Sequence, residues 1–358
     1  MLQLLFTMRT DQIGGTVPPF ENGAQLAVDD YYIDYKENGL DELHFSVLLN
    51  DPAYRYLEEE AKIRETVRGQ IYRVKAIDAG TTTARISCQL DVSDWQMDCI
   101  LGYSSNLAAV AAIDAVCPSG WRVFSSYAST FRYYLRMDGP TPLEVVQEVC
   151  QRHGCAVRFS TAAKYIRVID PEGAKLSSTI IADGLNLLQV NYKGSSADVY
   201  TRLYPVGKDG LTIESVNDNV AYIQDLSCVP RVISKLWVDE RYTDASSLLR
   251  AAKQRLKSAC RVSRSWEVDV ADLYELSGRS DLLLEMFALI RFVDPVRETP
   301  RDLRIVGQRV YPHYPERGKV WLSDIPNSRR WSTQQLTKRL SNALNDPNSD
   351  FWQRLNAR

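Results

Sequence analysis

Histidine and the familiar catalytic motifs are scarce in this sequence of 358 residues. Its three histidines, at positions 44, 153 and 313, leave few ways to build a histidine-based hydrolytic centre. There is no GxGxxG after a predicted strand, no GxxxxGK(S/T), no GxSxG and no HExxH. These absences argue against dinucleotide-binding, P-loop, α/β-hydrolase and metalloprotease functions. We therefore expect no catalytic residues and no cofactor.

Cysteine is present, but in no pattern that predicts a disulfide framework or a metal site. The seven cysteines run from Cys88 to Cys260 without a CxxC pair, and we interpret them as small apolar core residues. Cys150-x2-His153-x-Cys155 is the one candidate metal site. Cys150 lies on the apolar face of a predicted helix, and no second ligand pair follows at finger-like spacing. We expect no bound metal.

Long apolar runs are also missing. The strongest run, residues 282–292, is interrupted by Glu285 and Arg291 and favours a buried strand or a short helix. The first residues lack the basic start, apolar region and cleavage site of a signal peptide. We expect a protein that is made in a reducing cytoplasm, stays there until assembly and does not insert into a membrane.

Charge is unevenly placed along the chain, although the net charge is only −2. The first 60 residues contain three Lys/Arg and twelve Asp/Glu, whereas residues 301–358 contain eleven and five. The simpler interpretation is that these segments pack together or face solvent. The alternative is a pair of complementary surfaces that select one neighbour in an assembly. Without a concentrated basic face, the chain does not resemble a duplex-binding protein.

The chain is too long for one ordinary core, and its 19 tyrosines and frequent turn signals predict a β-rich α+β protein of several domains. Period-two alternation predicts strands over residues 70–77 and 83–90. Residues 201–225 predict a strand, a tight turn at Asp209-Gly210, a second strand over 211–213, a loop and a third strand.

Three helices are predicted before the C-terminal tail. The first is an Ala-rich helix over residues 105–116. The second begins at a capping box, Thr141-Pro142-Leu143-Glu144, and ends at Gly154. The third is a long amphipathic helix, capped by Thr243 or Asp244, whose apolar face comprises Ala245, Leu248, Leu249, Ala252, Leu256 and Ala259.

The sequence pattern of the C-terminal tail, residues 326–358, predicts a surface helix. Ser332-x-x-Gln335 is another capping box, and leucines recur every fourth residue after it. So narrow a stripe suits docking onto one surface, either of this chain's own fold or of a separate protein. The candidate contact residues are Leu336, Leu340, Leu344 and Trp352.

Four ordered groups of residues occupy most of positions 35–325. The first comprises NGLDELHF (38–45), DPAY (51–54) and QIYRVK (70–75). The second comprises TPLEVV (141–146) and GCAVRF (154–159). The third comprises YTRLYPVGKDGLTI (200–213) and the following Tyr222-Ile223. The fourth is Trp266-x-Val268-x-Val270-x-Asp272-Leu273, after the amphipathic helix.

This ordered set resembles the hub proteins at the distal end of bacteriophage tails. It is most similar to the N-terminal structural module of the siphophage tail-associated lysin, or prophage tail endopeptidase, family. One departure concerns residues 287–290, which are apolar where such proteins often carry a Gly-Asp turn that enters a strand.

The resemblance implies a multi-domain architecture with two barrel-like tube domains and smaller α+β domains. Residues 1–100 would form the first tube domain, 101–190 an α+β domain, 191–325 the second tube domain with the amphipathic helix, and 326–358 a helical tail. It further implies a homotrimer that forms a pseudo-hexameric ring at the distal end of the tail in the virion, after synthesis in the host bacterial cytoplasm.

In such a ring, the partners would be the distal tail protein, the tape-measure protein and the tip or fibre proteins. DNA would pass through the channel without specific binding, and an acidic lumen would repel its phosphates.

Two alternatives to this non-enzymatic hub stay open. A cell-wall hydrolase could use paired carboxylates such as Asp29-Asp30 or the acidic residues 58–60. A carbohydrate-binding module could use the aromatic pairs Tyr31-Tyr32 or Tyr133-Tyr134.

Overall fold

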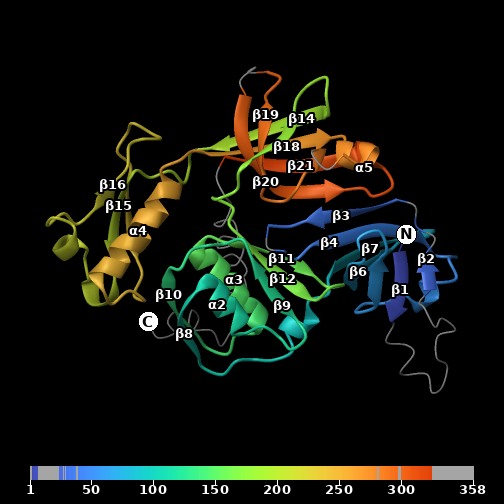
Figure 1. Cartoon of the computed structure of the whole chain (residues 1–358), viewed down its shortest axis with the longest axis horizontal. Helices are drawn as coiled ribbons and strands as arrows, with labels where there is room; N and C mark the ends of the chain where they lie inside the picture. Colours follow the sequence, from blue (N-terminus) through green and yellow to red (C-terminus); the bar gives the residue numbers. More distant parts are fainter. Residues whose placement is uncertain are drawn as a thin grey trace. The chain divides into compact units, whose positions relative to one another are not determined.

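The computed structural model describes residues 2–6, 24–26, 28, 30–37, 39–279, 282–296 and 300–324 (Figure 1). Over these residues the chain is β-rich with few helices, which confirms the predicted fold class. It divides into two compact units. The first contains the described parts of Met1–Gln189 and Val268–Trp321, and the second contains Val190–Glu267 and residues 322–324. The four predicted domains, with boundaries near 100, 190 and 325, stay a prediction.

The first unit is built on a long sheet that joins the two ends of the described chain. Its strand order is β20-β3-β4-β7-β6-β5-β1-β2, and every neighbouring pair in this path is antiparallel. The strands are β1 (Leu2–Phe6), β2 (Ala24–Leu26), β3 (Tyr31–Tyr35), β4 (Glu42–Leu48), β5 (Lys62–Glu65), β6 (Ile71–Ala79), β7 (Thr83–Leu90) and β20 (Pro300–Val310). The two strands predicted over 70–77 and 83–90 are confirmed as β6 and β7.

Other elements extend this unit. β20 also pairs with β19 (Leu289–Val293), which pairs in parallel with β13 (Leu176–Ile181). The apolar run over 282–292 therefore ends in a strand. The chain passes between the two units within β14 (Leu187–Ser195), β18 (Ser263–Val270) and β21 (Gly318–Ser323). Short helices are η1 (Tyr54–Tyr56), η2 (Ser93–Trp95), α5 (Leu273–Ser277) and η6 (Pro315–Arg317).

A second layer of the first unit combines helices with two small sheets. One sheet pairs β8 (Tyr103–Ala108) with β10 (Arg132–Met137). The other has the order β11-β12-β9, with β11 (Ala156–Ser160), β12 (Tyr165–Ile169) and β9 (Arg122–Ser125). One continuous apolar core includes residues from Leu2 to Val168. In it, the ring centre of Trp95 lies 5.6 Å from those of Trp121 and Phe159.

The helix predicted from the capping box is confirmed. In α3 (Pro142–His153), the Thr141 side chain accepts from the Glu144 backbone, the Glu144 carboxylate accepts from the Thr141 backbone, and Gly154 adopts a left-handed conformation. The Ala-rich helix predicted over 105–116 was wrong at its start. α2 covers only Ala109–Asp114, because the preceding residues pair with β10 in register, Asn106 opposite Tyr134.

In the second unit, one helix lies on one face of a three-stranded sheet (Figure 1). The sheet order is β16-β15-β17, formed by β16 (Ile223–Gln224), β15 (Arg202–Val206) and β17 (Ser234–Val238). The predicted amphipathic helix is confirmed as α4 (Ala245–Ala259), with Asp244 as its N-cap. Leu248, Ala252 and Leu256 pack with Leu203 of β15 in a separate core.

The strand predicted over residues 211–213 was wrong. The turn formers instead make η3 (Lys208–Gly210), in which Asp209 and Gly210 are left-handed, and η4 (Glu214–Val216) follows. Ile213 is fully buried in the α4 core rather than placed beside β15. The third predicted strand is confirmed as β16, which pairs antiparallel with β15, whereas the other neighbour of β15, β17, comes from later in the chain.

Candidate functional site

The pairing of β3 with β20 brings the acidic and basic ends of the chain together. Asp34 lies opposite Arg309 in the register of the two strands. Arg309 donates from Nε and Nη2 to the two carboxylate oxygens of Asp34, at 2.7 and 2.8 Å. Its guanidinium also lies 4.1 Å from the ring centre of Tyr32. The hydrogen bonds to Asp34 raise the pKa of Arg309, so its guanidinium stays charged.

A second, more exposed pair repeats this arrangement. Arg317 donates to Asp30 at 2.8 Å, and its guanidinium lies 4.5 Å from the ring centre of Tyr311. The two ion pairs show that acidic residues of the first segment pack against basic residues of the last. This confirms the simpler interpretation of the uneven charge. We call Asp30, Tyr32, Asp34, Arg309 and Arg317 the β3–β20 junction.

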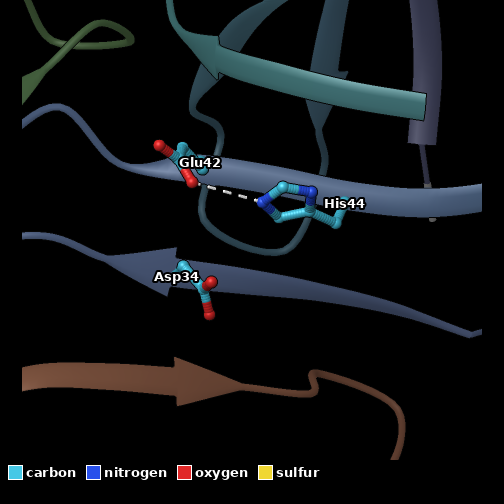
Figure 2. A group of neighbouring side chains, drawn as sticks. All are labelled: Asp34, Glu42 and His44. Carbon is cyan, nitrogen blue, oxygen red and sulfur yellow. Dashed lines mark hydrogen bonds and ion pairs between the residues drawn. The ribbon is translucent and has the colours of Figure 1, made fainter. Parts of the chain in front are cut away.

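Beside the junction, Asp34, Glu42 and His44 form the tightest acidic and histidine cluster in the described part of the chain (Figure 2). One ligand-type atom from each lies within 4.8 Å of the others. The carboxylates already have cationic partners, however. Lys36 Nζ is 3.0 Å from Glu42 and 3.8 Å from Asp34, and Arg309 occupies both oxygens of Asp34. A metal ion would have to displace two fixed cations, so the geometry favours an ion-pair network.

His44 also links Glu42 to Ser87, an arrangement that sequence reasoning missed. Its Nδ1 is 3.2 Å from Ser87 Oγ, and its Nε2 is 3.4 Å from Glu42 Oε2. Only the pairing register of β4 and β7 reveals this arrangement, because it places His44 directly opposite Ser87 and two residues beyond Glu42. Hydrogen bonds from His44 and Lys36 lower the pKa of Glu42.

The Ser87–His44–Glu42 series resembles a hydrolytic triad in composition but not in setting. Lys36 binds the same Glu42 oxygen as His44, and the imidazole stacks on Tyr32 with ring centres 4.9 Å apart. β4 and β7 each have paired strands on both sides, so the sheet ladder uses the backbone N–H groups that an oxyanion would need. The geometry favours cross-strand packing.

A buried ion pair fastens the β3–β4 turn to the second layer of the first unit. Arg158 of β11 donates to both oxygens of Asp41, at 2.8 and 2.9 Å. Burial raises the pKa of Asp41, and Arg158 opposes that rise. Gly39 makes the close approach possible, because its φ is +73° and a Cβ there would lie 2.6 Å from the carbonyl oxygen of Val157.

The sequence-level metal candidate does not form a ligand set among the described residues. Interaction with the Cys155 thiol, together with burial, raises the pKa of the Cys150 thiol. His153 is buried edge-to-face against Tyr133, with ring centres 4.7 Å apart. Neither ring nitrogen of His153 has a hydrogen-bond partner. Burial, reinforced by Arg152, lowers the pKa of His153 to about 4, so the imidazole is neutral at pH 7.

Acidification is expected to destabilise the first unit through His153. Its folded pKa of about 4 lies below the ordinary value of 6.5, so the unfolded chain binds more protons between these values. The free energy of unfolding should therefore fall as pH drops from about 6.5 towards 4, by about 2 kcal/mol from this group. Urea titrations of wild type and His153→Leu at several pH values measure this pH dependence of the unfolding free energy. An unchanged pH slope in the variant would contradict the assignment.

The predicted contact residues Leu336, Leu340, Leu344 and Trp352 lie outside the described residues. No helix in the described ranges combines the length and the apolar character needed to cross a bilayer.

Two family models match this sequence. The model described as the prophage endopeptidase tail N-terminal domain matches residues 11–89, and the prophage endopeptidase tail model matches residues 175–328. β3 belongs to the first match and β20 to the second, so the β3–β20 junction joins the two matched segments. A comparison with curated proteins found no match.

Solved structures show the same fold at low sequence identity. A prophage tail protein, gp18, from Listeria monocytogenes EGD-e has a TM-score of 0.60 at 17% identity, over 90% of this chain and 97% of that one. A 43 kDa tail protein of prophage MuSo2 from Shewanella oneidensis has a TM-score of 0.62 at 15% identity, over 84% and 95%. A tail protein from Neisseria meningitidis MC58 has a TM-score of 0.60 at 10% identity, over 90% and 94%. Together with the two family models, which match residues 11–89 and 175–328, this shared fold supports a phage tail family for the chain.

Proposed function

We propose that this protein is a structural hub at the distal tip of a phage tail, and that three copies form a pseudo-hexameric ring. The observation that carries the proposal is that the two matched segments fold into one sheet through the β3–β20 junction. A sheet assembled from both ends of the chain gives a rigid framework for ring contacts. Closure of a ring would also cover sheet edges that otherwise invite aggregation.

The proposed ring joins the tail tube and the distal tail protein to tip, fibre or enzyme components in the virion. Its channel surrounds the tape-measure protein and later passes DNA without specific binding. Part of the acidic charge of the first segment is balanced locally, since Asp34, Asp41 and Glu42 each have a cationic partner. Repulsion of phosphates in the channel therefore falls to other acidic residues, such as the exposed Glu59.

We further propose that the tail residues Leu336, Leu340, Leu344 and Trp352 contact a partner, either within the ring or on a neighbouring tail protein. The four-residue spacing supports this, because on a helix it would place the leucines on one stripe.

Electron microscopy of the purified, concentrated protein tests the ring. We expect particles with three-fold symmetry and a central hole. Rings of another symmetry, or a filament, would contradict the proposal.

A zymogram on host cell walls tests the absence of catalysis. Wild type, Ser87→Ala and His44→Ala should all leave the wall layer intact. A cleared band that disappears in Ser87→Ala would overturn the non-enzymatic hub and identify the Ser87–His44–Glu42 series as catalytic.

A further inference from the structure

The small sheet of the second unit has one covered face and one open face. On the covered face, Leu203 of β15 is fully buried under α4, and Trp237 of β17 packs against the same core. Side chains alternate between the two faces along a strand, so the neighbours of these residues lie on the opposite side. Leu236 and Val238 of β17 are there, and they are 63% and 56% exposed. The described part of the chain therefore leaves this face uncovered.

The uncovered face is apolar across the sheet. In the register of β15 and β17, Tyr204 lies opposite Leu236, and Val206 lies opposite Val238. Towards β16, the ring centre of Tyr204 is 5.3 Å from that of Tyr222, the residue just before that strand. We call Tyr204, Val206, Tyr222, Leu236 and Val238 the open face.

The strand pairing indicates what kind of element would cover the open face. β15 and β17 are parallel neighbours. Parallel strands occur almost only in sheets that are covered on both faces, usually by helices. Among the described residues of the second unit, α4 is the only α-helix. One more helix on the open face would complete the layer order helix, sheet, helix.

The C-terminal tail begins at this same unit. Asp324, the last described residue, belongs to the second unit, and Arg264 donates to its carboxylate at 3.3 Å. Residues 325–331 separate it from the capping box that begins at Ser332, and when extended they span at most about 25 Å. A compact unit of about 80 residues has a radius of gyration of about 12 Å. A helix that starts at Ser332 can therefore reach the faces of the second unit.

The predicted tail helix also fits the open face in size and character. On a helix, Leu336 and Leu344 would lie about 12 Å apart on one stripe, with Leu340 between them. Three strands at a spacing of about 4.8 Å present a face about 10 Å across, which is close to the width of one helix. A single narrow row of leucines matches a surface that one helix can cover.

We propose that the tail segment 332–344 packs as a helix on the open face of the second unit of its own chain, with its leucine stripe against Leu236 and Val238. This inference rests on the tail contact proposed above and places that contact within one chain. It does not require the ring.

Disulfide trapping in the full chain tests the contact. Leu236→Cys and Leu340→Cys are combined in a background in which the exposed Cys99 and Cys228 are replaced by serine. After mild oxidation and digestion with trypsin without reductant, we expect peptide 236–241 joined to peptide 340–354. On a denaturing gel without reductant, the linked protein should run as one chain. Circular dichroism checks that each variant is folded.

Lys235→Cys is the matched control for Leu236→Cys. Lys235 is the preceding residue of β17 and is also exposed, but it lies on the α4 side of the sheet, opposite Leu203 and 5.4 Å from the ring centre of Tyr200. Combined with Leu340→Cys, it should give little or no link. Equal linking from positions 235 and 236, or no link from either, would overturn the proposal. A link found only between two chains would overturn the placement within one chain.

Protease access gives a second measurement without engineered cysteines. In the wild type, packing of the tail should slow tryptic cleavage after Lys338 and Arg339. Leu236→Asp places a charge on the open face and should speed this cleavage about tenfold or more, the change expected when burial of one leucine side chain is lost. Lys235→Asp should leave the rate unchanged. Equal rates in wild type and Leu236→Asp would contradict the packing. Linkage within one chain is detected whether or not copies assemble, so failure of this contact and failure of the ring are distinguishable.

Discussion

Replacement of Arg158 by alanine is expected to lower the free energy of unfolding by about 4 kcal/mol at pH 7. The Asp41 side chain is only 4% exposed, and Arg158 is its bidentate partner. Without the guanidinium, a buried carboxylate loses its main compensating charge. The cost comes from that uncompensated charge rather than from lost packing alone. Equilibrium unfolding in urea, followed by fluorescence and circular dichroism, measures the change.

Charge removal and pH separate this explanation from simple packing loss. Adding Asp41→Asn to Arg158→Ala should recover part of the lost stability, because the buried charge is gone. Loss of Arg158 also raises the folded pKa of Asp41 further above its unfolded value. The folded state then binds a proton that the unfolded state does not. The difference in unfolding free energy between wild type and Arg158→Ala should therefore shrink as pH falls towards about 4. A deficit independent of pH and of Asp41→Asn would contradict the account.

Replacement of Arg309 by alanine is expected to lower the free energy of unfolding by about 3 kcal/mol. It removes two hydrogen bonds to Asp34, whose side chain is 9% exposed, and the contact with the Tyr32 ring. Lys36 Nζ, 3.8 Å from the Asp34 carboxylate, can compensate only part of its charge. The expected loss of stability is therefore smaller than that of Arg158→Ala. Urea unfolding of the purified variant gives the measurement.

Arg317→Ala is the matched control for the Arg309 variant. Arg317 also joins the last segment to the first and also lies over a tyrosine ring, but its side chain and that of Asp30 are each about half exposed. Because water screens this exposed pair, Arg317→Ala is expected to lower the free energy of unfolding by about 1 kcal/mol or less. Equal losses in the two variants would show that burial of Asp34 is not what makes the β3–β20 junction strong.

Sequence reasoning succeeded where local chemistry decides the structure. Thr141 and Glu144 satisfy backbone groups within one helical turn, so their spacing was enough to place the start of α3. The apolar stripe of α4 needed only a helical period. The alternation in β6 and β7 likewise reported a half-buried strand pair.

The failures all involve partners that lie far away in the sequence. Residues 105–116 were predicted to be helical because alanine favours helices, yet cross-strand pairing with β10 overrides that preference up to Ala108. Asp34 and Arg309 could be matched only by overall charge until the β3–β20 register was known. The contact between His44 and Ser87 likewise depends on tertiary structure.

Native mass spectrometry at micromolar concentration is the most direct test of the proposed closed ring of three copies. The account predicts a dominant species with the mass of three 40.7 kDa chains, and no species that grows further with concentration. A single 40.7 kDa chain at every concentration, or a dimer as the largest species, would contradict it.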